Sequence, residues 1–155
     1  MMGWPDAYDT NEDGAENMNE RARRAVGGGQ VLRYLWAAPC TLAGLAAALP
    51  LLLGGAQARL VLGVLEVSGS SIARRWPFDA ITFGHVVLAH TPRAMARWRR
   101  HERAHVRQCE RWGPLFFPAY LVAGAWQWLR GRSAYWDNPF EIQARNEALD
   151  AGDCA

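Results

Sequence analysis

Hydrophobic and polar positions divide the 155-residue chain into a polar beginning, one long apolar run and a mixed remainder. Residues 1–29 are rich in Asn, Asp and Glu and end in three consecutive glycines, which predicts a disordered tail and linker. The run from Leu35 to Leu53 contains no charged residue, and its length is close to the roughly 20 residues that a helix needs to cross a bilayer. We therefore expect a membrane-anchor segment over residues 30–58.

Three interpretations of this apolar run compete. We favour a transmembrane or membrane-inserted helix, in which Pro39 is easily tolerated and Pro50 could end the helix early. A secretory signal is the second interpretation, because several arginines precede the run and residues 56–58 resemble a small-residue cleavage site. A buried core helix is the third, although a domain of this size could hardly enclose it.

A second apolar stretch, from Leu115 to Leu129, predicts another helix but is short for a crossing. Its aromatic residues suit a membrane interface as well as a protein core. Arg is more frequent before the first run than directly after it, which would leave the tail cytoplasmic and the rest outside after a single crossing. The pattern leaves open whether residues 115–129 also insert.

The segment after the first apolar run has the pattern of β-strands. Residues 59–68 are rich in branched side chains, and a turn at residues 69–71 would fold this strand back onto Ile72 and its neighbours. Residues 80–89 predict the next strand. The whole pattern indicates an α+β fold with an apolar N-terminal helix, a small antiparallel sheet and three further helices.

The helix that follows the strands has clear boundaries. Thr91 offers a capping hydroxyl, and Pro92 fits the first helical position, where its missing N–H costs nothing. No Gly or Pro interrupts residues 93–112, and Gly113-Pro114 should end the helix. A later helix begins in the same way, with Asn138 before a proline.

The candidate chemistry lies in the middle of the first of these helices, in the pentapeptide His101-Glu102-Arg103-Ala104-His105. Residues four apart share one helix face, so the two histidines can present their nitrogens to one metal ion. Glu102 is then placed to handle the proton of a water molecule. The alternative is an Arg-rich solvated helix whose histidines bind no metal.

A catalytic zinc site also needs a third protein ligand, and Glu141 is the best candidate. It falls at the third position of the helix that Asn138 caps, so it could instead complete a capping box. Glu147 and Asp150 on the same helix are weaker candidates. Cys109 continues the four-residue spacing of the histidines, but we expect a buried, inert thiol there.

These motifs resemble the gluzincin group of zinc metallopeptidases, in which H-E-x-x-H supplies two histidines and a downstream E-x-x-A or E-x-x-S helix supplies a glutamate. More closely, HERAHVRQ (101–108), ERWGPLF (110–116), DNPFE (137–141) and residues 84–88 are similar to a small family of uncharacterised bacterial membrane-associated proteins. The match covers roughly the last two-thirds of the chain. It implies a minimal zincin-like domain over residues 59–150, followed by a short tail (151–155). It also implies that His101, His105 and Glu141 bind Zn²⁺ and that Glu102 is the general base and acid.

One position departs from the gluzincin pattern. Many members place Asp four residues after the glutamate ligand, where it accepts a hydrogen bond from a ligand histidine, whereas this chain has Arg145. We expect another acceptor there, Asp137 or Asp79. In zincins the strand before the metal helix borders the cleft. By that analogy His85 would face the substrate, and the alternative is a structural histidine. Gly84, which has no side chain, would let another backbone approach this strand.

The resemblance implies a membrane-associated zinc metallopeptidase, in which His85, Arg103 or Arg107 contacts the substrate or the transition state. The expected substrate is a membrane-proximal peptide or protein, and the expected location is the bacterial inner membrane. The alternative is a non-catalytic membrane protein with a structural zinc or no metal, whose Arg-rich helix binds lipid or a partner protein.

Composition adds limits to this picture. All 17 basic residues are Arg, which is typical of a G+C-rich coding bias, and a net charge of +2 without a recognition motif argues against nucleic-acid binding. Three scattered cysteines provide neither a disulfide framework nor a CxxC zinc pattern. The motifs, rather than the composition, therefore carry the functional prediction.

Overall fold

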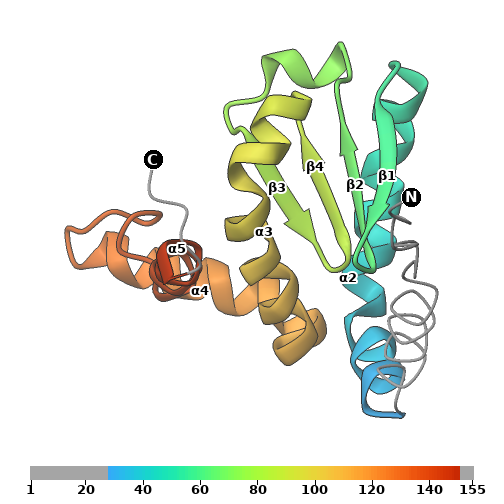
Figure 1. Cartoon of the computed structure of the whole chain (residues 1–155). Coiled ribbons are helices and arrows are strands. Elements are labelled where there is room, and N and C mark those ends of the chain that lie inside the picture. Colours follow the sequence, from blue (N-terminus) through green and yellow to red (C-terminus); the bar gives the residue numbers. More distant parts are fainter. Residues whose placement is uncertain (1–27, 151–155) are drawn as a thin grey trace, which may run out of the picture. The chain divides into compact units, whose positions relative to one another are not determined.

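A computed structural model describes residues 28–150 and has an α+β fold (Figure 1). Its elements in chain order are α2 (Gly28–Leu53), β1 (Gln57–Val61), β2 (Val64–Ser68), the 3₁₀ turn η1 (Ile72–Arg75), β3 (Ala80–Phe83), β4 (Val86–Ala89), α3 (Pro92–Trp112), the 3₁₀ turn η2 (Gly113–Leu115), α4 (Phe116–Leu129) and α5 (Pro139–Asp150). The chain divides into two compact units, Met1–Leu32 and Arg33–Ala155. The second unit contains the sheet, all later helices and α2 from Arg33 onward.

The predicted terminal segments fall largely outside the described residues. The tail expected over residues 1–27 and the short tail over residues 151–155 both lie there. Gly28 and Gly29, which we expected in the linker, are instead the first residues of α2.

The four strands form one mixed sheet in the order β1-β2-β4-β3. Strands β1 and β2 pair antiparallel, as do β3 and β4, but β2 pairs parallel with β4. The prediction of an antiparallel sheet is therefore wrong at this central pairing. Between β2 and β4 the chain passes through η1 and β3, so that β4 lies beside β2 and β3 is an edge strand. Helix α3 contacts this edge strand.

Each of the two segments that we predicted as one strand is in fact a tight hairpin. Residues 59–68 reverse at Leu62 and Gly63, whose φ angles of 50° and 80° are typical of a two-residue hairpin turn. Residues 80–89 reverse at Gly84 and His85. The first turn was hard to predict because a leucine rarely adopts a positive φ.

Helices cover both faces of the sheet. Alternate residues of β4 point to opposite faces, so Val86 and Leu88 pack with Ala48 and Leu51 of α2. On the other face, Val87 and Ala89 pack with residues of α3 that include Met95 and Val106. One face of α3 is thereby packed against the sheet, which fixes the position of this helix.

Helix α2 contacts the sheet through a narrow stripe and leaves the rest of its surface exposed. The buried stripe consists of small residues and one leucine, namely Ala37, Cys40, Gly44, Ala48 and Leu51. The segment Val31–Leu53 is long and apolar enough to cross a membrane, and 28% of its most apolar stretch is buried within the protein. These are properties of length and composition, which a signal sequence or a core helix can share, and the predicted break at Pro50 does not occur.

Gly84 lies where α2 comes closest to the β3–β4 turn. Its φ is +58°, and a Cβ atom there would lie 2.6 Å from the backbone nitrogen and 2.9 Å from the Cα of Thr41. Another backbone does approach Gly84, but it belongs to helix α2 and not to a chain in the cleft, where the zincin analogy places it. The Thr41 hydroxyl accepts a hydrogen bond from the backbone N–H of His85 at 3.1 Å.

We expect Gly84→Ala to destabilise the fold by about 2–5 kcal/mol, because about 1–2 kcal/mol of left-handed strain adds to about 1–3 kcal/mol of overpacking. Gly131→Ala is the matched control, since Gly131 has a φ of +72° but no atom lies within 4 Å of the position that a Cβ would occupy. Thermal or denaturant unfolding measures both variants. Equal losses of stability would show that the approach of Thr41 contributes nothing.

Candidate metal centre

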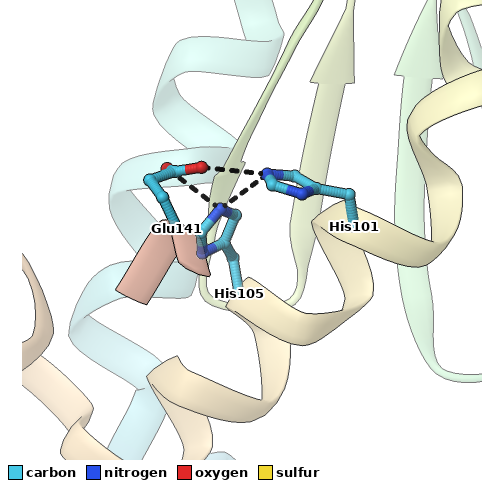
Figure 2. A group of neighbouring side chains, drawn as sticks. All are labelled: His101, His105 and Glu141. Carbon is cyan, nitrogen blue, oxygen red and sulfur yellow. Dashed lines mark hydrogen bonds and ion pairs between the residues drawn. The ribbon is translucent and has the colours of Figure 1, made fainter. Parts of the chain in front are cut away.

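Three buried side chains converge between α3 and α5 (Figure 2). The Nε2 atoms of His101 and His105 are 3.1 Å apart, and they lie 3.2 Å and 3.3 Å from the two oxygens of Glu141. Ligand atoms about 2 Å from one tetrahedral zinc ion would be separated by about 3.3 Å. The cluster therefore has the spacing of a metal site, and its N,N,O donor set suits zinc and other divalent transition metals.

Capping fixes the two helices that carry these three side chains. The Thr91 hydroxyl accepts from the N–H of Ala94 at 3.0 Å, and α3 runs from Pro92 to Trp112 as predicted. The Asn138 side chain accepts from the N–H of Phe140 at 3.1 Å at the start of α5. Both predicted helix starts are confirmed, and His101 and His105 lie in mid-helix, where side-chain directions are most rigid.

Glu141 is directed at the histidines and does not complete a capping box. The backbone N–H of Asn138, which a capping box would use, donates instead to the carbonyl of Tyr135 at 3.1 Å. The hydroxyl of Tyr120 donates to Glu141 Oε1 at 2.7 Å. The carboxylate therefore belongs to the cluster rather than to the end of its helix.

Charge and burial act in opposite directions at this carboxylate. Burial by itself would raise the pKa of Glu141, but the two neighbouring histidines and Tyr120 outweigh it and hold that pKa below its usual value. Burial would lower the pKa of His105, but Glu141 and Glu102 keep it above the usual value. An ionised Glu141 thus lies against both histidine rings, with one oxygen near each Nε2 atom.

Two buried atoms of the cluster make no hydrogen bond within the described residues, and these are His101 Nδ1 and Glu141 Oε2, whose only neighbour in the cluster is the ring nitrogen of His101 at 3.2 Å. Unpartnered buried polar atoms are uncommon and often mark the place of an ion or a water molecule. A metal ion bound by Glu141 Oε2 would give that oxygen its partner. The chemistry of the donor set and this unpartnered atom both fit a bound cation.

Gln108 is the hydrogen-bond acceptor that the sequence analysis did not identify. Its Oε1 lies 2.8 Å from His105 Nδ1, and its Nε2 donates to the carbonyl of Phe140 at 3.0 Å. A proton on Nδ1 leaves Nε2 of His105 available for a metal. Gln108 follows His105 by three positions on the same helix, so its spacing could have indicated this role.

Neither predicted acceptor contacts a ligand histidine. Asp79 Oδ2 accepts from the indole N–H of Trp98 at 2.8 Å. Asp137 Oδ2 accepts from the backbone N–H of Ser133 at 2.8 Å. Both carboxylates thus accept hydrogen bonds from groups other than the histidines. Gln108 is the acceptor beside His105 instead.

Glu102 lies next to the cluster, in the same helix as the histidines. It is buried, and its Oε2 accepts from the hydroxyl of Thr82 on β3 at 2.7 Å. Burial raises the pKa of Glu102, although the neighbouring His105 and the bond from Thr82 act against the shift. A buried carboxyl group with a raised pKa beside a candidate metal site is suited to proton transfer.

A cavity of about 350 Å³ opens beside these residues and is mostly apolar. The outer strand β3 forms one wall and helix α4 another, with Glu102 and the three cluster residues between them. Its other lining residues are Phe78, Ala80, Ile81, Thr82, Phe83, Phe116, Phe117, Tyr120, Leu121 and Tyr135.

The structure does not bring His85 or Arg103 to this cavity. His85 Nε2 lies 3.0 Å from Glu110, and its ring stacks on Tyr34 with 4.0 Å between centroids. Arg103 donates to the carbonyl of Val61 at 3.3 Å, beside the β1–β2 hairpin. His85 has the environment of a structural histidine, the second of its two expected roles.

The remaining candidates lie outside the cluster. Glu147 forms an ion pair with Arg107, and exposed Asp150 ends α5. Cys109 is fully buried, as expected, and burial raises its pKa to about 12, which disfavours the reactive thiolate form.

Comparisons of the chain with protein-family models, with curated proteins and with solved structures found no match. The likeness to gluzincins therefore stays a prediction, which rests on the residues quoted above and on their geometry.

Proposed function

We propose that this protein is a membrane-associated zinc-dependent peptidase. His101, His105 and Glu141 would hold the zinc ion, and Glu102 would be the general base and acid. The observation that carries the proposal is the triangle of donor atoms 3.1–3.3 Å apart, with a buried glutamate beside it and a cavity above it. Structural zinc sites usually have four protein ligands, whereas three ligands leave a position for catalysis.

The chain's own residues account for the proton transfers of peptide hydrolysis. A bound zinc ion would supply Lewis acidity, which polarises a carbonyl group and lowers the pKa of water. Glu102 takes one proton from the attacking water and then gives it to the amine that leaves when the C–N bond breaks. Thr82 holds one oxygen of Glu102 through its 2.7 Å hydrogen bond, which orients the carboxylate for this exchange.

We propose Tyr135 as the donor for the negative charge that develops on the carbonyl oxygen. It lines the cavity together with Glu102 and Glu141. Burial and the nearby Glu141 raise the pKa of Tyr135 to about 12, so its hydroxyl keeps its proton at neutral pH. Tyr135 would thereby take the role for which the sequence suggested His85, Arg103 or Arg107.

Exposed apolar side chains on two helices support the membrane association. On α2 the side chains of Leu42, Leu49 and Leu53 are exposed, and on α4 those of Val122 and Trp128. Large exposed apolar surfaces are unusual on proteins that contact only water. We propose that the protein lies at the bacterial inner membrane with lipid against these helices. We also propose that α2 is an anchor and not a cleaved signal sequence, because its buried stripe covers one face of the sheet.

Metal removal tests this function on the full chain in detergent. We expect about one zinc per chain, hydrolysis of peptides from a mixed library, loss of that hydrolysis with a chelator and recovery when zinc is restored. A purified protein that binds no zinc contradicts the proposal. Zinc retained without any hydrolysis would favour the alternative, a non-catalytic membrane protein with a structural metal.

A further inference from the structure

Helix α2 is packed against the rest of the domain along nearly its whole apolar length. A Cβ atom on Gly63 would lie 2.5 Å from the Tyr34 hydroxyl, and one on Gly44 would lie 2.8 Å from the Cβ of Val86. Leu51, near the end of the helix, is buried against the sheet. From Tyr34 to Leu51 the helix measures about 26 Å, most of the roughly 30 Å of hydrocarbon in a bilayer. Detaching α2 would uncover the apolar face of the sheet, so the sheet must follow the helix into any orientation at a membrane.

Strand β1 runs back beside α2 after the turn that ends the helix (Figure 1). Ala56 donates its N–H to the carbonyl of Leu51 at 2.9 Å, and the far end of the hairpin, at Gly63, lies next to Tyr34. β1 is an edge strand, so its outer N–H and C=O groups have no strand partner among the described residues. Open sheet edges do not occur in contact with hydrocarbon, because nothing there can bond to their backbone groups. If α2 crossed the bilayer, the edge of β1 would lie inside it.

A polar pair lies beside the middle of α2. The Thr41 hydroxyl accepts from the backbone N–H of His85 at 3.1 Å, and its oxygen lies 3.3 Å from Nδ1 of the same residue. Nε2 of His85 lies 3.0 Å from Glu110, whose side chain is 24% exposed. A crossing helix would hold this carboxylate near the bilayer midplane, where ionisable groups are costly. The pair and the strand edge both argue against a crossing.

The side of α2 that faces away from the sheet carries a row of leucines. Leu35, Leu42 and Leu49 are spaced by seven residues and therefore share one helix face, and Leu53 continues the row. Their exposed fractions are 66%, 65%, 61% and 90%. No charged residue lies between Leu35 and Leu53. The row is therefore an uncharged apolar surface about 27 Å long.

Strand β1 divides apolar from charged groups in the same sense. Leu60 pairs with Leu65, which packs with the cluster on the α2 side, so the 75% exposed Leu60 also lies on that side. Arg59 pairs with Glu66, which forms an ion pair with Arg99 of α3, so the exposed Arg59 lies on the opposite side. The apolar side of the sheet edge is thus the side of the leucine row.

We propose that α2 lies in the plane of one membrane leaflet, with the leucine row in the hydrocarbon, and does not cross the bilayer. The sheet takes the place of the polar face that an interfacial helix usually has. Lipid is the occupant that fits, because a protein interface has a polar rim and this row has no charge along its length. The inference rests on the membrane association in the proposed function, but not on hydrolysis. It places the metal centre on the membrane side from which the chain enters α2, whereas the distribution of Arg predicted opposite sides.

Depth measurements on the full chain, in vesicles of phosphatidylethanolamine and phosphatidylglycerol, test the orientation. A bimane label is attached to Leu35→Cys, Leu42→Cys or Leu49→Cys in a Cys154→Ser background, where the two cysteines that the structure describes are buried and should stay unlabelled. Nitroxide lipids carry the quencher either near the headgroup or near the end of the acyl chain. We expect all three labels at one shallow depth, about 5–10 Å into the boundary. A crossing helix would place Leu42 deepest, with the other two labels about 10 Å nearer the surfaces, and would overturn the inference.

Arg59→Cys in the same background is the matched control. Its side chain lies on the side of the sheet away from α2, so neither nitroxide lipid should quench its label. Strong quenching there would place β1 in the hydrocarbon and would contradict the in-plane orientation.

Substitution of the row tests the lipid contact separately. The triple variant Leu35→Ser, Leu42→Ser, Leu49→Ser should partition into the vesicles at least about 100-fold more weakly, with zinc content and melting temperature retained because these side chains are exposed. Leu149→Ser, at a 54% exposed leucine of α5, is the control and should bind the vesicles normally. A triple variant that still floats with the vesicles would overturn the proposed contact.

Failure of the proposed function has a different signature. Shallow labels on a protein that hydrolyses no peptide contradict the peptidase proposal alone, and hydrolysis with Leu42 deepest contradicts the in-plane orientation alone. A chain that never binds vesicles contradicts the orientation and the membrane association together, while zinc-dependent hydrolysis in detergent is unaffected.

Discussion

Glu102→Gln should lower the rate of peptide hydrolysis by about 10²- to 10⁴-fold while the protein retains its zinc. Gln has nearly the shape of Glu but cannot accept the proton of the attacking water. Glu102 lies beside the three candidate ligands without being one of them, because its carboxylate is hydrogen-bonded to Thr82 rather than directed at the cluster. Parallel measurements of zinc content and of peptide cleavage separate proton transfer from metal binding.

Glu110→Gln is the matched control for this substitution. Glu110 lies on the same helix but pairs with His85, which the structure places outside the cavity. We expect Glu110→Gln to keep its hydrolysis rate within a few-fold of the original even if the ion pair contributes to stability. Full activity in Glu102→Gln would remove the general-base role, and loss of zinc in that variant would make Glu102 part of the metal-binding structure instead.

Local signals made the two ligand helices predictable. A capping residue followed by proline marks the start of both α3 and α5, and both starts are where the sequence indicated. The spacing of His101 and His105 then follows from helix geometry alone. Only their meeting with Glu141 depends on the tertiary fold; the capped helix start suggested Glu141 as the third ligand, and the resemblance to gluzincins agreed with it.

The sheet was less predictable because its pairing is decided by contacts between distant segments. Nothing near β2 indicates that its central neighbour is β4, since that parallel pairing depends on the crossover through η1. The turn at Leu62-Gly63 was hidden within a run of branched residues. The position of His85 likewise depends on Glu110 and Tyr34, which come from two different helices.

Helix α2 shows why hydropathy could not identify its buried side. The run is apolar on every face, so no polar stripe distinguishes the surface that contacts solvent or lipid. The face against the sheet instead carries its small residues, because Gly44 must approach Phe83 and Val86 closely. Residue size, rather than hydrophobicity, is the signal that locates this contact.

Glu141→Gln should weaken zinc binding by more than about 100-fold. Loss of a residue that only hydrogen-bonds to a metal ligand usually costs roughly 10- to 100-fold in affinity, and loss of a charged ligand should cost more. The substitution preserves shape but removes the negative charge that lies 3.2 Å and 3.3 Å from the two ligand nitrogens. Competition with a chromophoric chelator measures the affinity directly. Glu147→Gln is the control, because Glu147 is a half-buried residue of the same helix whose ion pair is with Arg107, and this variant should bind zinc normally.

The same substitution should also uncouple zinc from the stability of the fold. A ligand that binds only the folded state stabilises it by about 2.7 kcal/mol at a concentration 100 times its Kd, so a 100-fold weaker site loses most of that stabilisation. We therefore expect added zinc to raise the melting temperature of the original protein and of Glu147→Gln much more than that of Glu141→Gln. An equal rise in all three proteins would show that Glu141 is not a ligand, and the two histidines would then need a different third partner.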